Sequence, residues 1–129
     1  LRSNKIEKIE VETFMGLNSL EYLDISNNRI KIVNKNTFYG LNSLRYINLI
    51  KNPIELIEQF SFSELKSLRS SPDSKGLDLN RLRLSNIEEN SLVGVNNFYE
   101  ANQYINFDNN QIRILKKNTF FHKKMNYLN

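Results

Sequence analysis

The sequence predicts an α/β solenoid, in which similar units stack their short strands in parallel to form one sheet. Two markers, an asparagine and a phenylalanine, recur every 24 residues: Asn4, Asn28 and Asn52, and Phe14, Phe38 and Phe62. In LEYLDISNNRI, residues 20–30, the apolar Leu23 and Ile25 alternate with polar residues, as in a strand with one buried face. One unit cannot bury these residues alone, so the pattern requires stacking.

The length of 129 residues suits one domain, which we expect to span residues 1–129 with about five units. The units are anchored at Phe14, Phe38, Phe62, Leu92 and Phe120. Because the last two spacings are 30 and 28 residues, residues 66–101 are expected to be degenerate repeats. The stretch SSPDSKG, residues 70–76, predicts an inserted loop, since Ser, Pro, Asp and Gly favour turns. This loop is either a ligand contact at the rim or a tolerated insertion.

The second half of each unit must return the chain to the start of the next strand. In KIVNKNTFYGL, residues 31–41, the phrase KNT and Gly40 predict a turn and a short helical or irregular segment. Val33, Phe38 and Leu41 are expected to point inward.

The repeated asparagine is expected to be structural. Where a strand ends inside the stack, backbone N–H and C=O groups lack both a strand partner and water, at a cost of roughly 1–3 kcal/mol each. An asparagine amide both donates and accepts on a short stem, so it can serve the backbone of its own unit and of the next. The predicted ladder consists of Asn4, Asn28, Asn52, Asn86 and Asn110.

The aligned units resemble the leucine-rich repeat, L-x-x-L-x-L-x-x-N-x-L, in its form of roughly 24 residues. They read LEYLDISNNRIKIVNKNTFYGLNS, LRYINLIKNPIELIEQFSFSELKS and NQYINFDNNQIRILKKNTFFHKKM. The resemblance implies a curved right-handed superhelix with the sheet on its concave face and short helical or irregular segments on its convex face. This type, with a Phe in the second half, is similar to repeats in the ectodomains of Toll-like receptors, Slit-like guidance proteins and leucine-rich-repeat G-protein-coupled receptors.

A partner is expected to contact the strand residues that alternate with the buried ones. These are Tyr22, Asp24, Ser26, Asn27, Tyr46, Asn48, Ile50, Lys51, Arg81, Arg83, Ser85, Tyr104, Asn106, Asp108, Asn109 and Tyr127. Four tyrosines share one repeat position, with Arg81 at that position in the irregular unit. The column is either a binding surface, since Tyr is enriched at interfaces, or a packing habit of strands. The arginines either meet an acidic patch or lie in a slipped register on a solvated surface.

Other functional classes find little support in the sequence. The net charge is +4 and no dense basic stripe is present, which disfavours nucleic-acid binding. There is no cysteine, and no apolar run approaches the length of a membrane span. The only histidine, His122, has no nucleophile or convergent carboxylates beside it in the sequence, so we expect neither an enzyme nor a bound metal or cofactor.

The resemblance therefore predicts a non-catalytic protein-interaction module, part of the ectodomain of a receptor or of a secreted adhesion protein. The alternatives are an intracellular scaffold or regulatory subunit, and a structural spacer. No N-x-S/T acceptor occurs, so the segment should carry no N-glycan. Unlike many extracellular members, the chain has no Cys-rich caps; it reads as an uncapped fragment, which is expected to self-associate through its exposed ends.

Overall fold

The computed structural model describes residues 1–68, 76–93, 95 and 104–119. Within these ranges the chain forms short strands: β1 (Tyr22–Asp24), β2 (Ile32–Val33), β3 (Tyr46–Asn48), β4 (Leu56–Ile57), β5 (Gly76–Asp78), β6 (Asn86–Ile87), β7 (Tyr104–Asn106) and β8 (Ile114–Leu115). Every hydrogen-bonded pair of strands is parallel. The described residues contain no helix, so the return segments expected to be helical or irregular consist of a two-residue strand and turns.

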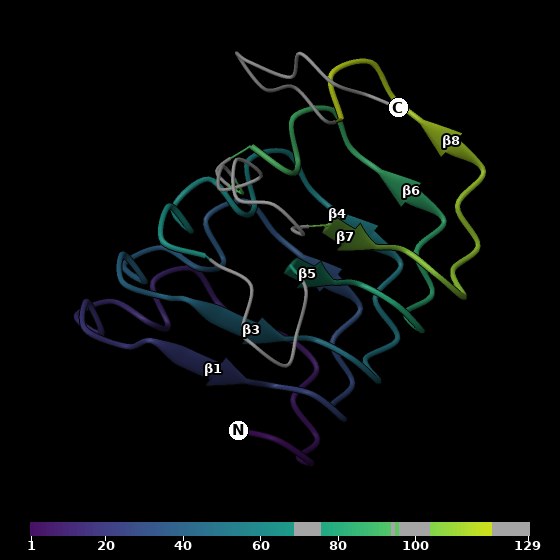
Figure 1. Cartoon of the computed structure of the whole chain (residues 1–129). Helices are drawn as coiled ribbons and strands as arrows, with labels where there is room; N and C mark the ends of the chain where they lie inside the picture. Colours follow the sequence, from purple (N-terminus) through teal and green to yellow (C-terminus); the bar gives the residue numbers. More distant parts are fainter. Residues whose placement is uncertain (69–75, 94, 96–103, 120–129) are drawn as a thin grey trace.

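The strands form two groups that alternate along the chain (Figure 1). The opening strands of the repeats make one group, in which β1 pairs with β3 and β5 pairs with β7. The strands of the second halves form a four-stranded sheet in the order β2-β4-β6-β8. Pairing follows the sequence period, since Tyr22 lies opposite Tyr46 and Ile32 opposite Leu56. The predicted parallel pairing of successive units is therefore confirmed.

The core is built from apolar residues that recur once per repeat. The rings of Phe14, Phe38 and Phe62 stack, with centroids 6.4 Å apart for the first pair and 5.5 Å for the second. Ile25 and Leu49, which follow β1 and β3, are fully buried. Burying one such side chain contributes about 1.5–3 kcal/mol, so these rows supply most of the stabilisation between neighbouring repeats.

The fourth repeat begins earlier than the sequence predicted. Its opening strand is β5, in which Leu77 lies opposite Ile105 of β7, rather than a strand containing Arg81 and Arg83. The segment GLDLNRLRLSNI, residues 76–87, contains two Leu-x-Leu pairs, and the asparagine after the second pair imitates the repeat marker. The predicted insertion therefore ends before Gly76, and the rest of that insertion lies outside the described residues.

The place of Asn86 follows from this register. Asn86 lies in β6, opposite Leu56 of β4 and Ile114 of β8, and not at the end of an opening strand. Its Nδ2 donates to Glu88 Oε1 at 2.8 Å, while its buried Oδ1 has no hydrogen bond. The prediction that Asn86 belongs to the asparagine ladder is wrong.

Backbone conformation supports the corrected register independently. Each repeat has one left-handed residue just before the ladder position: Ser3, Asn27, Lys51, Arg81 and Asn109. Each has a second one in its return turn: Glu12, Asn36, Phe60, Asn90 and Asn118. Arg81 is therefore the structural equivalent of Lys51, and the residue after it occupies the ladder position.

Candidate protein-interaction face

The opening strands β1 and β3 carry an exposed pair of tyrosines. Tyr22 and Tyr46 lie opposite each other, with ring centroids 6.3 Å apart and ring planes inclined by 43°. Tyr22 is 64% exposed and Tyr46 is half-buried. The pair offers a large aromatic surface with two hydroxyl groups, a composition that favours protein interfaces. We call the outward residues of β1 and β3, with the turn residues that follow them, the strand face.

The fourth repeat does not place Arg81 at the tyrosine position, where the sequence predicted it. There β5 has Gly76 at the tyrosine position, so Arg81 does not belong to the column. The side chain of Tyr104 lies outside the described residues, and so does all of Tyr127. The aromatic surface that the structure describes is thus confined to the first two opening strands.

The next outward position in each opening strand supports the backbone. One side-chain oxygen of Asp24 accepts the Ser26 N–H at 2.9 Å, and Asn48 accepts the Ile50 N–H at 3.1 Å. The same bond recurs in later repeats, from Asn80 N–H to Asp78 and from Asp108 N–H to Asn106. These residues, expected to contact a partner, therefore first fix the turn after each strand. Asp78 holds the place that the sequence reading gave to Arg83, and Asn80 the place that it gave to Ser85.

Electrostatics on the strand face centre on Tyr46. Burial raises the pKa of its hydroxyl, and the carboxylates of Asp24 and Asp78 raise it further. Burial also raises the pKa of Asp24, but hydrogen bonds from the Ser26 hydroxyl and N–H, together with the positive Arg2, outweigh it and leave that pKa lowered. Tyr46 is therefore a neutral phenol between two carboxylates, although its strand is not paired with β5.

The remaining predicted face residues lie in the turns. Ser26 is buried and Ile50 half-buried, whereas Asn27 and Lys51 are exposed. The Asn27 side chain donates to the Ser3 hydroxyl at 3.1 Å. In later repeats the predicted residues Arg81, Asp108 and Asn109 are exposed at such turns, and Arg83 and Ser85 are exposed between the turn and β6. Arg83 is the equivalent of Pro53 and lies beyond the ladder position.

The ladder asparagines bridge successive repeats. Asn52 donates to the Leu49 carbonyl of its own repeat at 2.8 Å and to the Ile25 carbonyl of the preceding repeat at 3.0 Å. Its Oδ1 accepts the Ile30 N–H at 3.1 Å. Asn28 and Asn110 make the same three kinds of bond, and Asn4 donates to Leu1 and Arg2.

The ladder is interrupted between Asn52 and Asn110. The corresponding residue of the fourth repeat is Leu82, which is 4% exposed and has no polar side-chain atom. It offers no acceptor to the Ile54 N–H, for which the structure shows no hydrogen bond, although Ile54 is fully buried. Sequence reasoning missed this substitution because it placed the ladder residue at Asn86.

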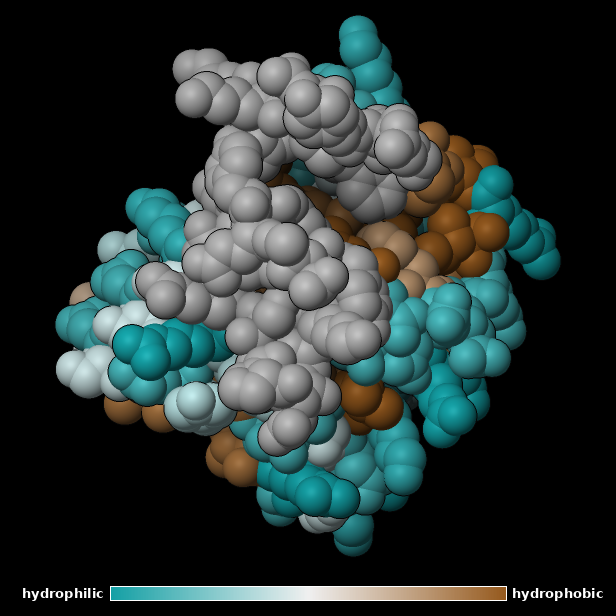
Figure 2. Space-filling model, in the orientation of Figure 1, coloured by the Kyte–Doolittle hydropathy of each residue, from teal (hydrophilic) through white to brown (hydrophobic). Residues whose placement is uncertain are grey.

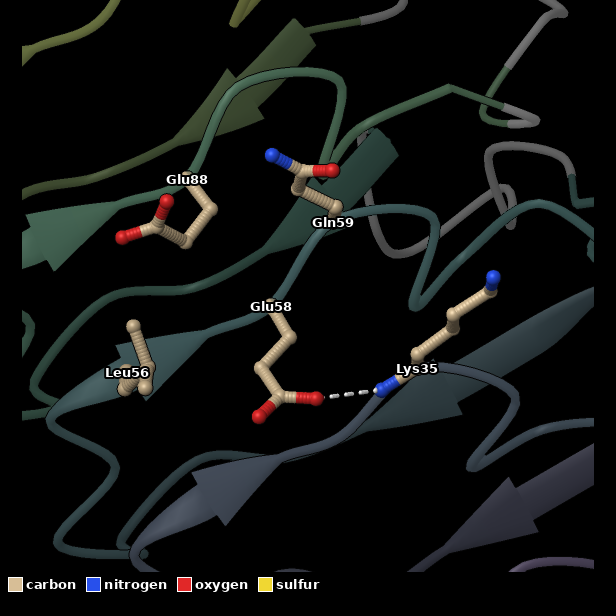
Figure 3. A pocket seen from close by; sticks show the side chains of 5 residues that line it. All are labelled: Lys35, Leu56, Glu58, Gln59 and Glu88. Atoms are coloured by element: carbon tan, nitrogen blue, oxygen red, sulfur yellow. Dashed lines mark hydrogen bonds between the residues drawn. The ribbon is translucent and has the colours of Figure 1, made fainter.

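A recess on the β4–β6 side is lined by Lys35, Leu56, Glu58, Gln59 and Glu88 (Figure 3). Both of its carboxylates are already paired: Glu58 accepts the Lys35 N–H at 2.9 Å, and Glu88 binds Lys116 Nζ at 2.8 Å. The residues that the structure describes hold no cluster of His, Cys, Asp and Glu suited to a metal ion. In those same ranges no helix is long and apolar enough to cross a membrane. His122 lies outside them.

Parallel strands in repeat register, an inward phenylalanine row and a bridging asparagine define a repeat protein. Residues 1–54 match the family described as leucine rich repeat. Such repeats are generally protein-interaction modules and are typically non-catalytic. No curated protein matches this chain.

Proposed function

We propose that the chain is a non-catalytic binding module whose strand face contacts a protein ligand, within the ectodomain of a receptor or of a secreted adhesion protein. In this proposal the repeats form a curved solenoid, with the strand face on its concave side. The observation that carries the binding role is the Tyr22–Tyr46 pair, because an exposed tyrosine ring beside a half-buried one on the adjacent strand provides an anchor for a partner.

The chemistry of the face suits a partner that combines apolar and polar groups. The two rings supply apolar area, and the Tyr46 hydroxyl lies in the field of two carboxylates. Lys51, exposed in the turn after β3, adds a positive charge to the strand face. Mixed surfaces of this composition are typical of reversible protein interfaces.

The binding role is tested by a screen of the chain against purified extracellular proteins, followed by affinity measurements on variants. Tyr22→Ala with Tyr46→Ala should weaken binding of a captured partner by at least about tenfold, which is the loss of about 1.4 kcal/mol. Tyr39→Ala is the matched control, since Tyr39 is an exposed tyrosine in the return turn and off the strand face. Equal affinities for the two variants would contradict the proposed face.

The extracellular setting competes with an intracellular scaffold. Surface biotinylation of cells that express the full-length gene product with a tag inside residues 1–129 separates the two. Labelling of intact cells, or recovery from the medium, supports the ectodomain. Labelling only after lysis supports the scaffold.

Exposed apolar residues support the predicted self-association. Ile114 and Leu115 of β8 are 62% and 56% exposed, and Figure 2 shows hydrophobic atoms gathered on the side where Figure 1 places β8. Met15 and Leu17 are exposed in the first repeat. Light scattering of residues 1–129 should therefore show oligomers that dissociate on dilution, whereas a monomer at high concentration would exclude this contact.

A further inference from the structure

The junction between β3 and β5 lacks the hydrogen bonds that join neighbouring opening strands elsewhere. Beyond β1, Ile25 N–H donates to the Asn48 carbonyl at 3.1 Å and Asn27 N–H to the Ile50 carbonyl at 3.0 Å. Beyond β5, Leu79 N–H and Arg81 N–H make the same two bonds to the next repeat, at 2.8 and 3.0 Å. The equivalent donors of the third repeat, Leu49 and Lys51, make no such bond to Asp78 or Asn80.

The ladder fails at the same junction. Asn52 joins the second repeat to the third, and Asn110 joins the fourth to the fifth. Leu82, at the same position of the fourth repeat, has no polar side-chain atom that could join this repeat to the third. The missing acceptor leaves the Ile54 N–H unpaired in a buried position. Two independent kinds of bond are therefore absent on this side of one junction.

The opposite side of the junction is intact. Strand β4 pairs with β6, with Leu56 opposite Asn86. Around this pairing, the N–H groups of Arg83, Ser85 and Glu88 donate to carbonyls of the third repeat at 2.9–3.3 Å. One side of the junction is thus fastened by a continuous sheet. In the part of the chain that the structure describes, the other side is held by the packing of buried residues such as Leu49 and Leu79 without a main-chain bond, so a bend there breaks no such bond.

The turn residues that flank the open side are unusual for their conformation. Lys51 and Arg81 have φ values of 60° and 53°, at a position that Asn27 and Asn109 fill in neighbouring repeats. Left-handed backbone costs roughly 1–2 kcal/mol for residues other than Gly, Asn and Asp. Ser3 of the first repeat has the same conformation, at φ 57°, so the strain at Lys51 and Arg81 belongs to the turn itself.

We propose that the β3–β5 junction is a hinge, at which residues 20–68 and residues 76–119 bend relative to each other about the β4–β6 pairing. Bending changes the separation between the tyrosine pair on β1 and β3 and the Asp78 carboxylate on β5. A partner that contacts both parts would then select one bend from a range already present in the free chain.

Spin labels at one repeat position test the hinge, because the chain has no cysteine of its own. The pair Lys51→Cys with Arg81→Cys spans the junction. The control pairs are Asn27→Cys with Lys51→Cys before it and Arg81→Cys with Asn109→Cys after it, and all four positions are exposed. Both control pairs should show strong dipolar broadening from a narrow range of distances between the labels. The junction pair should show weak broadening from a wide range of distances. Equally strong broadening and equally narrow ranges in all three pairs would overturn the hinge.

A second measurement needs no substitution and decides the matter if a labelled variant fails to fold. Amide hydrogen exchange of the unmodified chain should be at least about tenfold faster at Leu49 and Lys51 than at Ile25 and Asn27, since the first two lack a main-chain acceptor. Equal protection of the two sets would show that the junction is closed in solution and would overturn the proposal.

Discussion

The repeats before residue 68 and those after residue 76 use the same turns but differ in how they are joined. In the first part, the ladder asparagines, the opening strands and the phenylalanine stack all continue from one repeat to the next. In the second part, β5 and β7 pair and Asn110 bridges their repeats, but nothing equivalent connects β5 to β3. The family match to residues 1–54 falls within the regular part.

The comparison separates two roles of the repeat pattern. The apolar positions persist through the irregular repeat, since Leu77, Leu79 and Leu84 are buried there, so the core tolerates the change in spacing from 24 to 30 residues. The polar position does not persist, because Leu82 replaces the asparagine. A buried leucine keeps the packing but offers no hydrogen bond to the Ile54 N–H. The fold is therefore preserved, while the junction between the third and fourth repeats is loosened.

Replacing Asn52 by Leu should have the largest effect. The side chain is 2% exposed and makes three hydrogen bonds, so Asn52→Leu leaves the Ile30 N–H and two carbonyls without their partner. We expect the free energy of unfolding to fall by about 3 kcal/mol. Urea unfolding measures it, with Asn42→Leu, an exposed asparagine, as control. A loss below about 1 kcal/mol would refute the role of the ladder.

The reverse exchange at Leu82 should sharpen the contrast. An asparagine there can accept the Ile54 N–H and donate to the Leu49 and Leu79 carbonyls, and these bonds outweigh the lost apolar burial. We expect Leu82→Asn to raise the free energy of unfolding by about 1 kcal/mol, whereas Leu82→Ala should lower it by about 2–5 kcal/mol. Equal destabilisation by the two variants would mean that the fourth repeat cannot receive a ladder residue.

Relieving the backbone at the junction should have a smaller effect. Lys51→Asn places at φ 60° the residue type found at the equivalent positions 27 and 109. The thermal midpoint should rise, with a gain of roughly 0.5–1 kcal/mol, because Asn tolerates left-handed backbone. Lys51→Gln is the control that removes the charge and keeps the strain. A gain of the same size for both variants would assign the effect to charge.

The smallest expected effect is a pH dependence from Asp24. Its folded pKa lies below the unfolded value of about 3.9, so its contribution to stability is present above that value and is lost as pH falls through the folded pKa. Asp24→Asn keeps the turn bond, as Asn48 does, and cannot titrate. The drop in urea midpoint from pH 7 to pH 3 should be smaller in the variant, and an unchanged drop would contradict this assignment.

Sequence predicted the regular repeats well because two independent markers, the asparagine and the phenylalanine, kept one period. It identified Leu23, Ile25 and Phe38 as core, and it gave the tyrosine pair its place on neighbouring strands. It failed where the markers disagreed. In residues 76–87, Leu82 occupies the asparagine position while Asn86 imitates it, and only strand pairing decides between the two registers.

The sequence prediction gave the outward polar residues a role in partner contact and missed their second role, the hydrogen bond that fixes the turn after each strand. Asp24 and Asn48 alternate with buried residues, which indicates exposure, but alternation says nothing about what a short side chain bonds. Their oxygens accept the N–H two residues later, as Asp and Asn commonly do at turns. The recurrence of Asp or Asn at this position, at Asp78 and Asn106 as well, is the signal that could have revealed it.

One measurement tests the central claim most directly: the amide exchange rates of Ile30, Ile54 and Leu84 in the unmodified chain. These three residues share one repeat position, and their N–H groups face Asn52, Leu82 and Asn110 respectively. Ile30 and Leu84 donate to an asparagine at 3.1 and 3.2 Å, whereas Ile54 has no such acceptor. We predict exchange at Ile54 at least about tenfold faster than at the other two. Protection of Ile54 equal to that of Ile30 would contradict an open junction between the third and fourth repeats.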